Sequence, residues 1–292
     1  MPVASQLLQY LVSGLTLGSI YGMIALGFTL IYNATGVVNF AQGEFVTYGA
    51  LIAISGVGFG LPMPLAVLGA MVAVMALGAV VERGAIRPAR GASVITLIII
   101  TVGASMLLRG LAMWIWGQDA LPLPHFSGEN PIRFAGASIL PQHLWVMGVV
   151  LTTMLLLWVL GERTQVGKAM RACAINRSAA QLVGIPVARM VMLSFALSGL
   201  LGGLAGAIVA PLSMGQFNMG VMLGLKGFAA AILGGMGNPM GAVLGGVLLG
   251  ALESTSAVVL PSGYKDAVAF AVLLIVLLTR PQGLLGRGTR VV

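Results

Sequence analysis

Long apolar stretches follow one another along the chain, and each approaches the roughly 20 residues that cross a bilayer as a helix. The pattern predicts membrane segments at about 7–31, 37–58, 63–82, 92–116, 143–161, 189–211, 217–235, 239–260 and 265–280. Their residues are apolar on every side, whereas the strands of a membrane barrel would alternate. We therefore expect an all-α fold, a polytopic transmembrane helical bundle of about 8–9 membrane segments that forms one domain over residues 1–292.

Two of these segments contain polar or glycine-rich interruptions. Segment 37–58 starts with the polar run NFAQGE, and segment 217–235 carries Lys226 and runs into ILGGMGNPMG. Such interruptions are tolerated at membrane depth only where the backbone is buried in protein or lines a cavity. We expect either segment to be broken or re-entrant, as in the substrate paths of transporters. The two halves of the sequence correspond only loosely, so the sequence alone establishes no repeat.

The composition supports a membrane protein, because only 8% of the residues are charged, against roughly 25% in soluble domains. Mean hydropathy is +1.04. The net charge of +8 does not indicate nucleic-acid binding, since eleven of fifteen basic residues fall within 83–90, 163–189 and 280–290. Clusters of this kind mark cytoplasmic loops. We place loop 162–188 and the tail inside, and loop 117–142 and the N-terminus outside.

No catalytic or metal-binding signature is present in the sequence. GERTQVGKA (161–169) has five residues between its glycines, whereas a phosphate-binding loop has four and then Lys and Ser or Thr. His125 and His143 lack neighbouring Cys or acidic residues, so we expect no metal site. The single cysteine, Cys173, allows no internal disulfide. The N-terminus lacks a basic region and a cleavage site, so we expect no signal peptide.

Ionisable residues at membrane depth are the strongest site candidates, because each costs roughly 3 kcal/mol or more when it faces lipid. Glu44 is the only charged residue in the first 81 positions. Our hypothesis pairs Glu44 with Lys226 across the core, either as a packing lock or in direct contact with substrate. Arg109 is interpreted as a structural residue that reaches the interface, and Glu253 as slightly more structural than functional.

The remaining polar residues of the NFAQGE run, Asn39 and Gln42, are better candidates than Glu44 for lining a path. The predicted set of path or core polar residues is therefore Asn39, Gln42, Glu44, Lys226 and Glu253. Glycines four apart predict closely packed helices. These pairs are Gly14/Gly18/Gly22, Gly199/Gly203, Gly202/Gly206, Gly241/Gly245 and Gly246/Gly250.

The inside loop 162–188 is too long for a simple turn. From Val166 to Leu182 its basic and apolar residues favour an amphipathic helix, and Gly184 offers a helix stop. Such a helix lies on lipid headgroups or docks into a groove on a cytoplasmic partner. The residues alone favour neither.

Several stretches together resemble a known family. They are GLTLGSIYGMIALGFTLIYNATGVVNFAQGEF (14–45), RACAINRSAAQLVGI (171–185), GLKGFAAAILGGMG (224–237) and YKDAVAFAVLLIVLLTRPQGLLG (264–286). The chain resembles the LivH-type permeases of the high-affinity branched-chain amino acid ABC importers from about residue 10 to residue 286. The resemblance is weakest in loop 117–142.

The resemblance implies a permease of the bacterial inner membrane that works with several partners. These are a second permease subunit or copy, two cytoplasmic ATPases that use ATP, and a periplasmic solute-binding protein. It also implies that this chain binds no cofactor and is not an enzyme. Loop 162–188 becomes the ATPase-coupling segment, through Lys168, Arg171, Ala172, Asn176 and Gly184. Residues 172–174 read Ala-Cys-Ala and depart from the E-A-A…G pattern of many importers, so the assignment rests on position and Gly184.

Three other functions are the alternatives. A urea or short-chain amide ABC permease carries a similar NFAQGE-like run. A self-contained channel or ion-coupled carrier needs deep acidic residues, and only Glu44 and Glu253 are available. A membrane scaffold without transport explains no polar residue in the interrupted segments. The expected function is an ATP-driven importer of branched-chain or related aliphatic amino acids.

Overall fold

A computed structural model describes residues 3–134, 137–259, 264–280 and 282–286. Its elements, in chain order, are α1 (Val3–Thr35), α2 (Gln42–Gly58), α3 (Met63–Val81), a π-helical turn η1 (Glu82–Ile86), α4 (Val94–Trp116), β1 (Ile132–Phe134), β2 (Ala137–Ile139), α5 (Pro141–Arg163), α6 (Gln165–Ile175), α7 (Arg177–Leu182), α8 (Val187–Ser213), α9 (Met219–Gly234), α10 (Pro239–Val259) and α11 (Lys265–Thr279). Within the described residues, six helices are long and apolar enough to cross a membrane, and α9 and α11 are shorter apolar helices.

The helices confirm the predicted all-α fold and most of its boundaries. Two differences are informative. Segment 37–58 is helical only from Gln42, because residues 37–41 form a non-helical approach to α2. The inside loop folds as α6 and α7 rather than as one helix, because Asn176 interrupts the first helix and caps the second.

The basic segments gather at one end of the bundle, which we call the basic end. Arg90, after η1, donates to the Ala188 carbonyl at the start of α8 over 3.4 Å. Arg177 on α7 donates to the Ala34 carbonyl at the end of α1 over 2.6 Å. Residues 282–286 lie beside the α9–α10 turn, which contacts this same end of α1. These contacts agree with the placement of the basic segments on one side.

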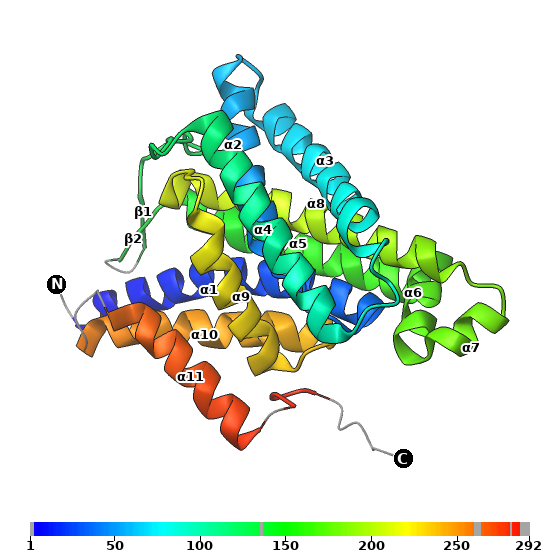
Figure 1. The fold of residues 1–292 in the computed structure, drawn as a ribbon. Coiled ribbons are helices and arrows are strands. Elements are labelled where there is room, and N and C mark those ends of the chain that lie inside the picture. Colours follow the sequence, from blue (N-terminus) through cyan, green and yellow to red (C-terminus); the bar gives the residue numbers. More distant parts are fainter. Residues whose placement is uncertain (1–2, 135–136, 260–263, 281, 287–292) are drawn as a thin grey trace.

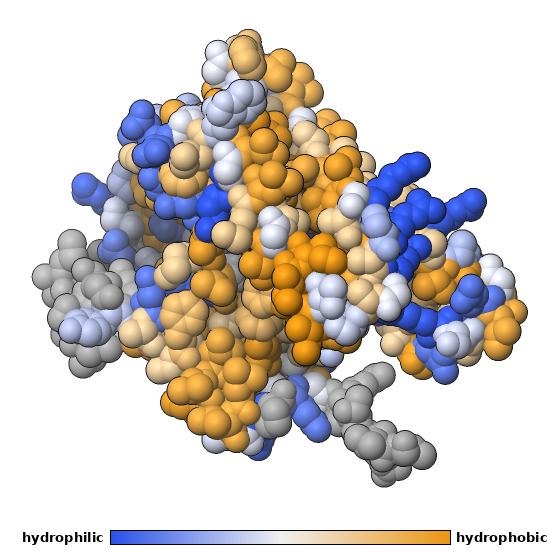
Figure 2. All heavy atoms as spheres, in the orientation of Figure 1, coloured by the Kyte–Doolittle hydropathy of each residue, from blue (hydrophilic) through white to orange (hydrophobic). Residues whose placement is uncertain are grey.

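The opposite end carries the β1–β2 hairpin, and we call it the hairpin end. The two strands pair antiparallel, with Ile132 opposite Ile139. Leu121, in the loop before the hairpin, pairs through its backbone with Gly215 after α8. Figure 1 shows the hairpin and the start of α1 far from α6 and α7. In Figure 2, hydrophobic side chains cover the middle of the molecule and hydrophilic ones gather toward its ends.

Glycine faces bring the long helices into backbone contact, as their spacing predicted. A Cβ on Gly18 of α1 would lie 2.6 Å from the Val247 Cα of α10. A Cβ on Gly206 of α8 would lie 2.0 Å from the Val46 carbonyl oxygen of α2. These contacts require glycine, and they place α1, α2, α8 and α10 in the buried centre of the bundle.

The bundle contains an inverted repeat that the sequence did not reveal. Helix α1 packs on α10, and in the same way α8 packs on α3. Helix α2 packs on α3 and α8, and its counterpart α9 packs on α10 and α1. Finally, α2 contacts α4, and α9 contacts α11. The contacts also match in register. Gly78 of α3 faces the Phe195 carbonyl of α8, and Gly246 of α10 faces the Gly18 carbonyl of α1. Helices α1 and α8 run in opposite directions between the two ends. The four helices α1–α4 therefore correspond to α8–α11 with inverted orientation, an architecture found in many transporters.

Candidate functional site

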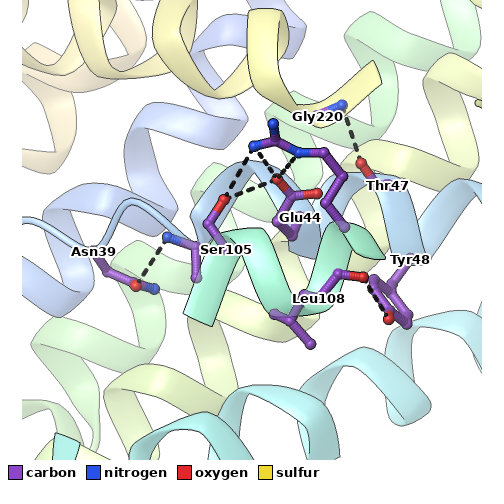
Figure 3. A network of polar contacts seen from close by, with 9 residues as sticks. Asn39, Glu44, Thr47, Tyr48, Ser105, Leu108 and Gly220 are labelled. Atoms are coloured by element: carbon purple, nitrogen blue, oxygen red, sulfur yellow. Dashed lines mark hydrogen bonds and ion pairs between the residues drawn. The ribbon is translucent and has the colours of Figure 1, made fainter. Parts of the chain in front are cut away.

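The starts of the two shorter helices α2 and α9 meet at the centre of the inverted repeat. A Cβ on Gly43 would lie 2.2 Å from the Gly220 carbonyl oxygen, and one on Gly220 would lie 2.1 Å from the Gly43 carbonyl oxygen. The two helices therefore cross in backbone contact. The Gly220 N–H donates to the Thr47 hydroxyl over 3.0 Å (Figure 3). Helices α2 and α9 are each continuous, so neither is broken within Gln42–Gly58 or Met219–Gly234. Substrate sites of repeat-built transporters lie at the interface of the two repeats.

A groove of about 180 Å³ opens beside this crossing, between α2, α4 and α9. Pockets for drug-sized ligands begin at roughly 300 Å³, so this groove fits a smaller molecule. Its walls are mostly apolar and include Phe28, Phe40, Val102, Met106, Leu225 and Phe228. Its polar side chains are Glu44, Ser105 and Arg109.

The polar side chains of the groove form one network centred on a single carboxylate oxygen (Figure 3). Ser105 donates to Glu44 Oε1 over 2.9 Å. Arg109 donates to the same Oε1 from Nε over 3.2 Å and from Nη2 over 3.1 Å. Glu44 Oε2 has no hydrogen-bond partner within the part of the chain that the structure describes. One acceptor of the carboxylate is therefore left over.

The charge pair lies at membrane depth rather than at a helix end. Ser105 is the middle residue of α4, and Arg109 lies one turn beyond it. The Glu44 side chain is 1% exposed and that of Arg109 is 33% exposed. A partly exposed guanidinium at this depth is costly against lipid. The open side of the groove therefore has to face water or protein.

The structure corrects the hypothesis that Glu44 pairs with Lys226. Glu44 pairs with Arg109 instead, so the interpretation of Arg109 as a residue that merely reaches the interface was wrong. Lys226 Nζ lies 2.8 Å from Glu253 Oε1 and 2.6 Å from Asp266 Oδ1. The cause is geometric, because α9 turns Lys226 away from α2 and toward α10 and α11.

In the Lys226 cluster all the ammonium donors of the lysine are paired. Lys226 also donates to the Tyr21 hydroxyl over 3.3 Å, so its three ammonium donors have three partners. Tyr21 in turn donates to Glu253 Oε2 over 2.9 Å. Neither Lys226 nor Glu253 lines the groove. The cluster ties α1, α9, α10 and α11 together.

The predicted path residues Asn39 and Gln42 are buried behind the groove. The Asn39 side-chain oxygen accepts from the Ala41 N–H over 3.1 Å and holds the turn into α2. The Gln42 amide donates to the Ser198 carbonyl over 3.3 Å and accepts from the Ser198 hydroxyl. Of the two side chains, only Gln42 fixes the start of α2 against α8. Of the five predicted path or core residues, only Glu44 lines the groove.

The predicted coupling residues lie on α6, at the cap between α6 and α7, and in the turn after α7. Lys168, Arg171 and Asn176 are exposed, and Ala172 is half-buried against the bundle. Asn176 accepts from the Ala179 N–H over 3.0 Å and caps α7. Gly184 has φ +84°, a conformation that favours glycine, and ends the segment as predicted.

Three further residues of these networks were missed by sequence reasoning. Ser105 and Tyr21 are uncharged residues inside apolar helices, and nothing in their surroundings marks them. Asp266 lies near the start of α11 and resembles an interfacial residue. A charge inventory that pairs every membrane-depth acid with every base would have suggested Asp266. Within the described residues, no group of three or more His, Cys, Asp or Glu side chains could hold a metal ion.

Comparison with known proteins decides the family. A family model described as "Branched-chain amino acid transport system / permease component" matches residues 10–277. The chain belongs to this family. The expected LivH-type resemblance is therefore confirmed, and the chain is a transport component of the permease class.

The similarity to individual permeases of this family covers nearly the whole chain. The chain is 36% identical to the high-affinity branched-chain amino acid transport system permease protein LivH of Escherichia coli K12, over 96% of both chains. It is 37% identical to the corresponding BraD protein of Pseudomonas aeruginosa, over 98% of both chains. A solved structure of a metal-chelate type ABC transporter in an inward-facing conformation superposes with a TM-score of 0.50 at 17% identity, over 92% of this chain and 85% of that one. That likeness supports the fold.

Proposed function

We propose that this protein is the membrane-spanning permease subunit of an ATP-driven importer of branched-chain amino acids in the bacterial inner membrane. The observation that carries the proposal is the 36–37% identity to LivH and BraD over nearly the whole chain. A mostly apolar groove with a single charge pair is consistent with a small aliphatic amino acid as cargo. The relatives favour this cargo over the urea or short-chain amide alternative.

The proposed partners follow from the family. A second permease subunit or copy would lie across the transport path from the open side of the groove, where Arg109 is partly exposed. Two ATPase subunits would bind the pair of permeases, and α6 and α7 would be the docking surface on this chain. The Ile175 and Leu182 side chains on these helices are 87% and 89% exposed. A solute-binding protein would deliver cargo at the hairpin end. ATP would act through the ATPases, and we propose that this chain itself binds no cofactor.

A self-contained channel or carrier receives no support from the site. Such a mechanism needs an acid that is free to exchange a coupling ion. Glu253 is bound by Lys226 and Tyr21, and the charge of Glu44 is already paired with Arg109 even though its Oε2 has no hydrogen-bond partner among the described residues.

The test is reconstitution of the chain with its cognate permease, ATPases and binding protein in liposomes. We expect uptake of leucine, isoleucine or valine that requires both ATP and the loaded binding protein. The chain alone should hydrolyse no ATP. Uptake that persists without ATP, or stimulation only by a urea- or amide-binding protein, would contradict the proposal.

A further inference from the structure

The groove presents two opposite charges that are only partly used by each other. The three bonds to Glu44 all end on Oε1, and Oε2 has no hydrogen-bond partner among the described residues. Arg109 uses Nε and Nη2 toward Glu44, whereas a guanidinium carries five N–H donors. A buried acceptor without a partner and unused guanidinium donors therefore belong to one network whose residues line one groove.

This arrangement complements a zwitterion. A free amino acid carries an ammonium, which only donates, and a carboxylate, which only accepts. Charge-assisted bonds of this kind are about twice as strong as neutral ones. The Glu44–Arg109 pair is neutral overall, so a zwitterion adds no net charge to the membrane interior. A ligand with a single charge would add one, at high cost.

The rest of the groove suits an aliphatic side chain. The Phe28 and Phe40 rings lie 5.7 Å and 5.6 Å from the Phe228 ring and form one apolar wall. Val102 and Met106 lie on the α4 side of the groove. Burial of apolar surface favours binding by roughly 25 cal/mol per Å². The backbone of Gly43 and Gly220 contributes no side-chain volume and keeps the groove open.

We propose that this groove is a transient binding site for the transported amino acid, with Glu44 Oε2 accepting from its ammonium and Arg109 donating to its carboxylate. The aliphatic side chain lies against the three phenylalanines. The proposal rests on the proposed function for the identity of the cargo. The network holds together without ligand, so binding is weak, as a conduit requires.

A protection experiment on the assembled complex tests this directly and does not need transport. Met106 lines the groove and is 66% exposed, and the native Cys173 is buried, so Met106→Cys gives this chain one exposed thiol, and labelling is read on this chain. We expect leucine to slow modification of this thiol about twofold at the concentration that half-fills the site. Isopentylamine and 4-methylpentanoate, which each carry one of the two charges, should give no protection.

Charge variants show whether the pair itself binds the cargo. Glu44→Gln or Arg109→Gln should abolish protection by leucine, with affinity lowered by about tenfold to a hundredfold. Glu82→Gln is the matched control, because Glu82 is also 1% exposed and pairs with a partly exposed arginine, Arg90, outside the groove. Protection should persist in that variant.

Two results would overturn the proposal. One is a lack of protection by leucine in a complex whose ATP-dependent leucine uptake is intact. The other is equal protection by the two single-charge compounds, which would make the groove an apolar site only. If the parent complex instead takes up no branched-chain amino acid, the proposed function fails. The protection experiment still decides, independently of uptake, whether the groove binds leucine through both of its charges.

Discussion

The Glu44–Arg109 pair and the Lys226 cluster occupy related places in the two halves of the inverted repeat. The first joins α2 to α4, and the second joins α9 to α11. In the Lys226 cluster every ammonium donor has a partner, whereas Glu44 keeps one oxygen without a partner among the described residues and lines a groove. The comparison shows that burial of a charge does not identify a site. What identifies it is hydrogen-bonding capacity left over beside open space.

The largest effect on stability is expected in the Lys226 cluster. Lys226→Met should lower the free energy of unfolding by about 3 to 5 kcal/mol, because Glu253 would stay buried without its cation. Thermal unfolding of the purified complex measures this. Adding Glu253→Gln to Lys226→Met should recover part of the loss. A single variant that unfolds like the parent would show that the cluster does not hold α9, α10 and α11 together.

The crossing of α2 and α9 should be the next most sensitive feature. Gly220→Ala places a Cβ 2.1 Å from the Gly43 carbonyl oxygen. Overpacking of this kind costs about 1 to 3 kcal/mol, and we expect uptake to fall with it because the groove lies beside the crossing.

The matched control for that change is Gly103→Ala on α4, where a Cβ meets nothing within 4 Å. That variant should be neutral, or stabilised by up to about 1 kcal/mol through helix propensity. Equal behaviour of the two alanine variants in uptake and thermal unfolding would argue against backbone contact at the crossing.

A smaller effect is expected at the basic end. Asn176→Ala removes the cap of α7 and should cost about 1 kcal/mol of local stability. We expect weaker binding of the ATPase subunits, measured by titration of the purified permease with ATPase. Asn176→Asp keeps a capping oxygen and should bind normally. If alanine and aspartate bind alike, the order of α7 does not matter for docking.

The smallest effect concerns Cys173 on α6. Burial raises the pKa of its thiol above the usual value. Less thiolate is therefore present near pH 8 than at an exposed cysteine, and modification by N-ethylmaleimide should be slow and should rise only at higher pH. Ser178→Cys, at an exposed position of α7, provides the comparison. Similar rates at pH 8 would mean that α6 does not pack on the bundle.

Most of the fold could be predicted from the sequence because lipid imposes simple rules. Apolar runs gave the spans, and the three basic segments meet at one end as the loop charges indicated. Glycine spacing predicted closely packed helices, and the structure shows such contact between α1 and α10. The inverted repeat could not be predicted, because the two halves share the way in which their helices pack rather than the identity of their residues.

The candidate site was predicted only in part. Glu44 was found because a lone carboxylate in an apolar segment has to be paired. Its partner was assigned wrongly, because sequence spacing does not say which way α9 turns Lys226. Arg109 was interpreted as structural because it lies toward the outer end of its span, although its side chain bonds to Glu44. Which charges meet depends on helix rotation, which apolar periodicity does not determine in helices that are apolar all round.

In this protein the Glu44–Arg109 pair serves transport, whereas the Lys226 cluster only holds the bundle together. The most direct measurement is ATP-dependent leucine uptake per assembled complex for Glu44→Gln and Asp266→Asn, side by side in liposomes. We predict that Glu44→Gln lowers uptake by about tenfold or more, whereas assembled Asp266→Asn complexes transport like the parent. Equal uptake by the two variants, or greater loss in Asp266→Asn, would contradict this account.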